Sequence, residues 1–212
     1  MQRINSMIIC TFNVNSIKAR KDLILAWLEH RSYDIDILCF QELKTEETSF
    51  PYQDFQSLGY QSIVFGQKTY NGVAICSKLP IDKTSHGFGE EDGDRQSRLI
   101  TARIADIHII NAYAPHGDLR ATEKFQYKQG WYKTLLSYLK KNFSRDASLL
   151  LVGDLNIAFT DSDVYDADAL ADTIGTMPEE RALLQSLYDW GLFDSFRYLY
   201  PDQRKFTWWD YR

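Results

Sequence analysis

The feature that most constrains the fold is a set of strongly apolar runs, each of which leads into a polar residue. These runs are Met7–Asn13, Ile35–Phe40 and Leu149–Val152. Their length and composition are typical of strands buried inside a protein. Asn13, Glu42 and Asp154 stand at or just beyond their ends. Because α/β proteins build sites at the ends of buried strands, the sequence predicts a functional site that contains these three residues.

The rest of the pattern alternates between strands and helices. Further strands are predicted at Gly59–Phe65, Gly72–Ser77, Leu99–Ile104, Ile107–Tyr113 and Phe206–Trp209. Leu99–Ile104 and Ile107–Tyr113 are expected to form a hairpin through Ala105 and Asp106. A first helix is predicted after Ser16, with a buried face formed by Leu23, Ile24, Trp27 and Leu28. A second is predicted at Thr122–Phe143, with an apolar stripe formed by Phe125, Tyr132, Leu136, Leu139 and Phe143. A third is predicted at Pro178–Trp190. Hairpins mixed with helix-linked crossovers indicate an α/β fold, and the lack of a linker indicates one domain over residues 1–212.

Composition limits the cellular setting and the classes of function. The net charge of −5 argues against binding to nucleic acid by bulk charge, although a metal ion and a local basic strip could still meet phosphates. The three cysteines lie in apolar runs without C-x-x-C spacing, as expected of reduced core thiols in a cytoplasmic protein. No apolar run is long enough to span a membrane, so no membrane partner is expected.

Two motifs carry carboxylates in positions that suit catalysis. Glu42 directly follows a buried strand, where a carboxylate is costly unless a cation or hydrogen bonds compensate it. It is interpreted as a Mg²⁺ ligand, and the alternative is a loop or helix-capping carboxylate. Asp154 and Asn156 are two residues apart, so in an extended chain they point the same way and could orient a water molecule. The alternative there is a turn that closes the strand.

Two other strand ends carry candidate polar residues. Asn13 and Asn15 are also two residues apart after a strand. Tyr113 stands between two alanines, where its phenol could donate a hydrogen bond to a phosphate oxygen. Equally, it could be a packed tyrosine whose hydroxyl is satisfied by the protein.

Taken in order, the motifs strand-N-x-N, strand-Q-E, N-x-Y-x-P and G-D-x-N are far more specific than any one of them. Together with the segments Phe12–Arg20, Gly66–Ala74, Asp163–Asp166 and Phe206–Arg212, they closely resemble the exonuclease III family of AP endonucleases. That family belongs to the wider endonuclease/exonuclease/phosphatase superfamily, and the resemblance runs from about Met7 to Arg212. It implies a four-layer α/β sandwich, of two packed mixed sheets flanked by helices, here lacking its C-terminal closing segment.

The resemblance also implies roles for the strand-end residues. Glu42 would be the principal ligand of Mg²⁺, with Mn²⁺ as a possible substitute, and Asn13 would lie beside the metal. Asp154 would align or deprotonate the attacking water, supported by Asn156. Tyr113 would donate a hydrogen bond to the scissile phosphate.

Contacts to duplex DNA are implied for a second group of residues. This substrate-binding group comprises Asn15, Lys44, Tyr70, Asn71, Arg98, His116 and Trp208. The Tyr70–Gly72 loop would touch the DNA backbone, and Trp208 would line the pocket for an abasic sugar. His116 departs from the family, which often has an amide at that position. Lys18, Arg20 and Lys21 are further candidates, with an ordinary solvated charge run as the alternative.

The family pattern includes a final S-D-H motif that does not occur in this sequence. The four histidines are His30, His86, His108 and His116, and none follows Ser-Asp. We therefore expect Arg212 to end a truncated sequence that lacks a closing strand and the Asp-His half of the site. If the 212 residues were the whole chain, its activity would be weakened or would need a partner segment.

The leading hypothesis is a monomeric, Mg²⁺-dependent nuclease for double-stranded DNA. It would incise abasic sites and also act on 3′ ends as a 3′→5′ exonuclease and 3′ phosphatase. One alternative is a phosphatase or phosphodiesterase for lipid or small phosphate esters. The other is a non-catalytic DNA-binding remnant, because the terminal Asp-His is absent.

Overall fold

The computed structural model describes residues 6–30, 34–89 and 94–207, and it divides into two compact units. The first unit contains Met1–Tyr113 and Ala147–Leu155, and the second contains Ala114–Asp146 and Asn156–Arg212. The single domain expected over residues 1–212 stays a prediction.

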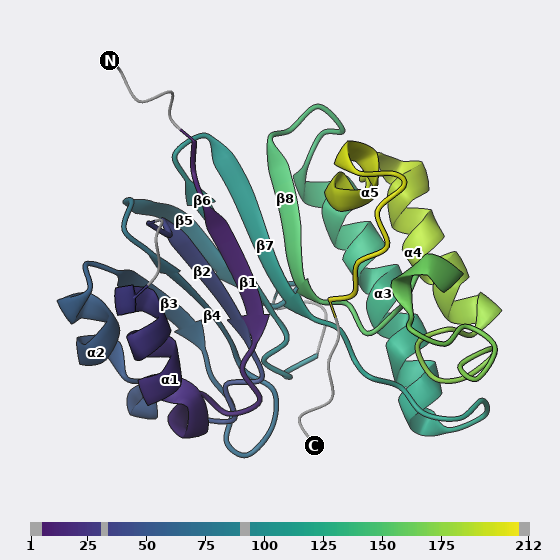
Figure 1. The fold of residues 1–212 in the computed structure, drawn as a ribbon, viewed down its shortest axis with the longest axis horizontal. Helices are drawn as coiled ribbons and strands as arrows, with labels where there is room; N and C mark the ends of the chain where they lie inside the picture. Colours follow the sequence, from purple (N-terminus) through teal and green to yellow (C-terminus); the bar gives the residue numbers. More distant parts are fainter. Residues whose placement is uncertain (1–5, 31–33, 90–93, 208–212) are drawn as a thin grey trace. The chain divides into compact units, whose positions relative to one another are not determined.

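The first unit contains two mixed sheets of four strands each (Figure 1). The first sheet has the order β1-β2-β4-β3, formed by β1 (Ile9–Asn13), β2 (Ile37–Gln41), β3 (Gln61–Phe65) and β4 (Val73–Ser77). The second has the order β5-β6-β7-β8, formed by β5 (Ile81–His86), β6 (Leu99–Ile104), β7 (Ile107–Tyr113) and β8 (Leu149–Asp154). The β1–β2 and β7–β8 pairs are parallel and the others are antiparallel. The predicted class of two mixed sheets and the β6–β7 hairpin are confirmed.

The two sheets pack face to face through small and branched side chains. One cluster contains Ile37, Cys39, Val73 and Ile75 of the first sheet and Ile100, Ala102, Ile104 and Ile109 of the second. Alternate residues of β2, among them Leu38 and Phe40, point to the opposite face. Because β2 is covered on both faces, its sequence is apolar throughout instead of alternating.

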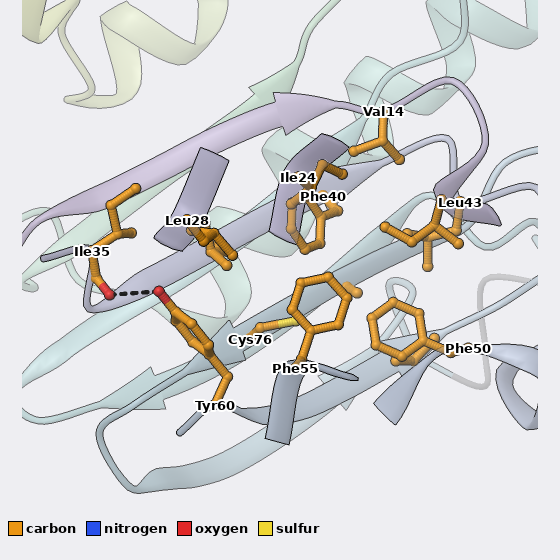
Figure 2. Packing of buried hydrophobic residues seen from close by; sticks show 14 residues of the cluster. Val14, Ile24, Leu28, Ile35, Phe40, Leu43, Phe50, Phe55, Tyr60 and Cys76 are labelled. Carbon is orange, nitrogen blue, oxygen red and sulfur yellow. Dashed lines mark hydrogen bonds between the residues drawn. The ribbon is translucent and has the colours of Figure 1, made fainter. Parts of the chain in front are cut away.

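Helices cover the outer face of the first sheet. Helices α1 (Ile17–His30) and α2 (Tyr52–Ser57) supply Ile24, Leu28 and Phe55 to a core that also contains Phe40 (Figure 2). The ring centroids of Phe40 and Phe55 lie 5.5 Å apart. A short 3-10 helix, η1 (Glu47–Ser49), precedes α2.

The buried face of α1 differs from the predicted one. Leu23 and Trp27 are 71% and 40% exposed, whereas Ile17, Ile24 and Leu28 are buried. These three residues are spaced at i, i+7 and i+11, which places them on one stripe of an α-helix. Leu23 lies about 100° away from Ile24 and therefore falls outside this stripe.

The second unit is helical in the part of the chain described. It contains α3 (Glu123–Asn142), η3 (Asp161–Asp163), α4 (Pro178–Trp190) and α5 (Ser195–Leu199), and α3 packs against α4. The Thr122 side chain caps α3 by accepting a hydrogen bond from the Phe125 amide at 3.2 Å. The buried residues of α3 are Lys128, Trp131, Tyr132, Leu135 and Leu139, so Phe125, Leu136 and Phe143 of the predicted stripe are only partly buried.

Other expectations fail where sequence periodicity is weak. The polar edge strand β5 and the short helices α2 and α5 gave no pattern that predicted them. The predicted strand at Phe206–Trp209 is wrong for Phe206 and Thr207, and the rest of it lies outside the described residues. Within the described chain, no helix combines the length and apolar character needed to cross a membrane.

Gly153 is required where β8 pairs with β7. Its φ is +128°, and a Cβ at this position would lie 1.9 Å from the Ala112 carbonyl oxygen. We expect Gly153→Ala to lower the free energy of unfolding by about 3 kcal/mol, because the backbone overlap forces the strands apart. Urea denaturation measures this loss. Gly89→Ala is the matched control, since Gly89 has a φ of +113° but a Cβ added there would have no atom within 4 Å. Equal losses of stability in both variants would contradict the steric argument.

Candidate functional site

Polar side chains from both sheets meet at one edge of the first unit. Asn13 ends β1, Asp154 ends β8, and Glu42 follows β2. The Asn13 side-chain amide donates hydrogen bonds to Glu42 Oε1 at 2.8 Å and to Asp154 Oδ2 at 2.8 Å. One amide therefore bridges two carboxylates that belong to different sheets.

Lys44 closes the group on the other side of Glu42. Its Nζ lies 3.0 Å from Glu42 Oε2 and donates to the side-chain oxygen of Asn15. The Asn15 amide in turn donates to Asn13 Oδ1 at 3.0 Å. Asn13 and Lys44 thus hold the two oxygens of the Glu42 carboxylate, and Asn15 links these two residues to each other.

Tyr113 and Arg98 complete this edge. Tyr113 is paired with Asp154 in the β7–β8 register, and its hydroxyl is hydrogen-bonded to Glu42. The Arg98 guanidinium lies 4.9 Å from the centre of the Tyr113 ring and donates to the Tyr113 carbonyl at 3.2 Å. Arg98 is therefore linked through Tyr113 to the Glu42 carboxylate, and Tyr113 stands opposite Asp154 in the strand register.

These contacts set the protonation states of Glu42 and Tyr113. Burial opposes ionisation of Glu42, but hydrogen bonds from Asn13, Lys44 and Tyr113 outweigh it, so the pKa of Glu42 lies below its usual value. Burial raises the pKa of Tyr113, and the neighbouring Glu42 charge raises it further despite Arg98. At neutral pH, Glu42 is an anion and Tyr113 a protonated hydrogen-bond donor.

The backbone around these side chains adopts conformations that L-residues rarely take. Positive φ angles occur at Asn15 (42°), Glu42 (54°), Lys44 (53°), Asn71 (53°) and Asn156 (51°). In the Glu42–Lys44 segment, the Leu43 amide donates to the Gly72 carbonyl at 3.1 Å and the Lys44 amide donates to the Asn71 carbonyl at 2.9 Å. Backbone strain of this kind costs on the order of 1–3 kcal/mol per residue and concentrates at functional sites.

A buried amide pair behind the site received no role from the sequence. Gln41 Nε2 donates to Asn111 Oδ1 at 2.7 Å, and Asn111 Nδ2 donates to the carbonyls of Phe40 and Ala74 at 2.9 Å each. Gln41 and Asn111 are 1% and 0% exposed, and they join the two sheets next to Glu42. The signal that could have identified them is a polar residue inside an otherwise apolar strand.

The loop before β4 presents one aromatic residue to solvent. Tyr70 is 67% exposed, whereas Asn71 is buried. The Asn71 amide donates to Gln67 Oε1 at 2.9 Å and to Gln96 Oε1 at 3.1 Å, and Arg98 Nε also donates to Gln96 Oε1 at 3.0 Å. Asn71 thus anchors the loop, while Tyr70 is accessible to a partner molecule.

The remaining predicted residues lie in the second unit or outside the described chain. Asn156 Nδ2 donates to the Ala114 carbonyl at 2.8 Å, and the Asn156 carbonyl accepts from Lys128 Nζ at 2.7 Å. The side chain of His116 is exposed, and its carbonyl accepts from Lys128 Nζ at 3.1 Å. Trp208 lies outside the described residues.

The carboxylate oxygens of Glu42 and Asp154 suit a hard cation as ligands. Glu42 and Asp154 offer carboxylate oxygens within reach of one amide, and Mg²⁺ needs few protein ligands because water and phosphate oxygens complete its shell. Across residues 6–30, 34–89 and 94–207, no three His, Cys, Asp or Glu side chains gather into a metal cage. Glu42 is ionised at neutral pH and so offers a charged oxygen to such an ion.

Comparison with known proteins identifies the family. Residues 10–212 match the Endonuclease/Exonuclease/phosphatase family. The chain belongs to this family. Exodeoxyribonuclease III of Haemophilus influenzae is 37% identical over 214 residues, which cover 95% of this chain and 79% of the relative. The resemblance inferred from the strand-end motifs is therefore confirmed.

Solved structures of family members share the fold. A 3′ phosphatase from Neisseria bound to a product DNA hairpin superposes with a TM-score of 0.92 at 36% identity, covering 98% of this chain and 80% of that one. An AP endonuclease from Archaeoglobus fulgidus gives a TM-score of 0.91 at 37% identity, with 98% and 79% coverage. The predicted α/β class with two mixed sheets flanked by helices is thus that of the family's DNA-processing enzymes.

Proposed function

We propose that the chain is a DNA-repair nuclease of exodeoxyribonuclease III type, which hydrolyses phosphodiester bonds at abasic sites and at 3′ ends. The observation that carries the proposal is the Asn13 amide that bridges Glu42 and Asp154. It brings a candidate metal ligand and a candidate base together from two sheets. The names of the relatives, which include an exodeoxyribonuclease III, a 3′ phosphatase and an AP endonuclease, support the same activity.

The proposed roles follow from charge and hydrogen-bonding capacity. Asp154 accepts a proton from the attacking water, and Asn13 fixes the orientation of its carboxylate. Tyr113 donates to a phosphate oxygen that gains charge in the transition state, because its phenol stays protonated. Asn156, two residues after Asp154, holds the water or a phosphate oxygen.

Glu42 and Asn13 are the residues that would hold the metal, for which Mg²⁺ is proposed and Mn²⁺ is an alternative. A bound divalent cation would neutralise the phosphate and stabilise charge on the leaving oxygen. Lys44 neutralises Glu42 at 3.0 Å, so its ammonium would turn toward the phosphate when a cation takes over that carboxylate.

DNA contacts are proposed for residues around this edge. With a net charge of −5, binding depends on local groups such as Lys44, Arg98 and the exposed Tyr70. Asn15, Asn71, His116 and Trp208 complete the proposed substrate-binding set. We also propose that the protein acts as a monomer in the cytoplasm.

Incision of a duplex with one abasic-site analogue tests the proposal. With Mg²⁺, we expect a single cut directly 5′ to the lesion, and EDTA should abolish it. A phosphoinositide tests the main alternative, since hydrolysis of that lipid without DNA cleavage would replace the proposal with a phosphatase for phosphate esters. Tight binding of the duplex without a cut at any Mg²⁺ or Mn²⁺ concentration would instead indicate a DNA-binding remnant.

A further inference from the structure

Lys128 and Glu180 form an ion pair that has no contact with solvent. Lys128 lies in α3 and Glu180 in the first turn of α4, and Nζ lies 2.6 Å from Oε1. Both side chains are 0% exposed. Removing two charges from water costs about as much as their attraction returns, so a buried pair adds little net stability compared with apolar residues of the same size. Stability alone therefore does not account for this pair.

The ammonium of Lys128 reaches two segments that carry candidate site residues. Besides Glu180, it donates to the Asn156 carbonyl at 2.7 Å and to the His116 carbonyl at 3.1 Å. An ammonium has three donors, and these acceptors match them. Glu180 Oε2 accepts from the Gly175 amide at 2.6 Å, which adds a third segment. The ion pair thus joins the 114–117 segment, the 156–158 segment and the turn at Gly175.

Close packing shows that these segments are shaped around the ion pair. Gly117 has a φ of +82°, and a Cβ there would lie 2.9 Å from Lys128 Cδ. Asn156 has a φ of 51°, in the left-handed region that asparagine tolerates better than most residues with a side chain. Its carbonyl is held by Lys128 and its side-chain amide by the Ala114 carbonyl at 2.8 Å. Both ends of Asn156 are therefore fixed within the second unit.

We propose that the Lys128–Glu180 pair is a positioning device for Asn156 and His116. It holds the backbone at both residues so that their side chains keep one orientation, and it does not itself touch the substrate. This inference rests on the proposed nuclease function of Asn156 and His116. It predicts that the charges at positions 128 and 180 matter for turnover more than for folding.

The test uses the double variant Lys128→Met/Glu180→Leu, which removes both charges and leaves no unpaired one. We expect kcat for abasic-site incision to fall about 10- to 100-fold, with KM within about 3-fold. Tm should fall only moderately, because the Asn156 and His116 carbonyls and the Gly175 amide lose a partner while no charge is left unpaired. Hydrogen exchange of peptides covering 114–118 and 156–160 should accelerate, while exchange in the first unit stays the same. Lys133→Met, an exposed lysine on the same helix, is the control and should match the wild type.

The outcomes separate this proposal from the proposed function. A double variant with wild-type kcat and unchanged exchange at both segments would refute the positioning role. A large loss of Tm with faster exchange throughout the protein would assign the pair a purely structural role and would also overturn the proposal. If the wild type does not cut DNA, the proposed function fails, and hydrogen exchange at the two segments still decides whether the pair fixes them.

Discussion

Replacement of Asp154 by Asn is expected to lower kcat for abasic-site incision by about 10²- to 10⁴-fold, the usual contribution of a general base. The side chain keeps its shape, and its carbonyl oxygen can still accept the 2.8 Å hydrogen bond from Asn13. What the amide loses is the ability to take a proton from water. Binding of the duplex should weaken by less than about 3-fold, because the amide keeps the shape of the carboxylate and the loss of one negative charge adds no repulsion toward the phosphates.

Single-turnover kinetics with saturating enzyme separate the chemical step from binding. Asp106→Asn is the matched control, since Asp106 lies in the β6–β7 turn with a side chain that is 99% exposed. It should retain wild-type kinetics. An Asp154→Asn protein within a few-fold of the wild-type rate would show that another group takes the proton.

The order of strands was predictable because each buried strand has a distinct apolar signature. Leu99–Ile104 and Ile107–Tyr113 were predicted with the bounds that the structure has. The polar strand β5, whose residues are almost all exposed, carries no such signature and was missed. The buried face of α1 was assigned wrongly because Leu23 and Trp27 are apolar but lie beside the stripe that meets the sheet. The sequence shows which positions of a helix are apolar, whereas the sheet or helix that packs against it decides which of them are buried.

The site shows a similar division. Asn13, Glu42 and Asp154 were grouped from their places at strand ends, and the structure brings them within hydrogen-bonding distance. The supporting residues were not given roles, because their partners lie far away in the chain. Gln41 meets Asn111 across 70 residues, and Lys128 meets Glu180 across 52. A lysine in a helix normally faces solvent, so the burial of Lys128 could not be read from its sequence neighbours.

Replacement of Glu42 by Gln is expected to raise the Mg²⁺ concentration needed for half-maximal activity by at least about 100-fold. The amide can still accept from Asn13, but it offers a neutral oxygen where the cation requires a charged one. It also loses the ion pair with Lys44. Because the charged oxygen is gone, binding of Mn²⁺ should weaken by a similar factor when it is titrated by water-proton relaxation without DNA. That measurement tests the metal assignment independently of turnover.

Glu46→Gln provides the control, because Glu46 is exposed and its side chain forms no capping hydrogen bond. It should leave the Mg²⁺ requirement and Mn²⁺ binding at their wild-type values. If Glu42→Gln also did so, the metal would have to bind elsewhere, and the lowered pKa of Glu42 would reflect only its contacts with Asn13, Lys44 and Tyr113. Reduced turnover with unchanged Mn²⁺ binding would likewise move the metal away from Glu42. Its carboxylate would then serve to orient Asn13 and the Tyr113 hydroxyl, and the bridge from Asn13 to Asp154 would become the functional link between the sheets.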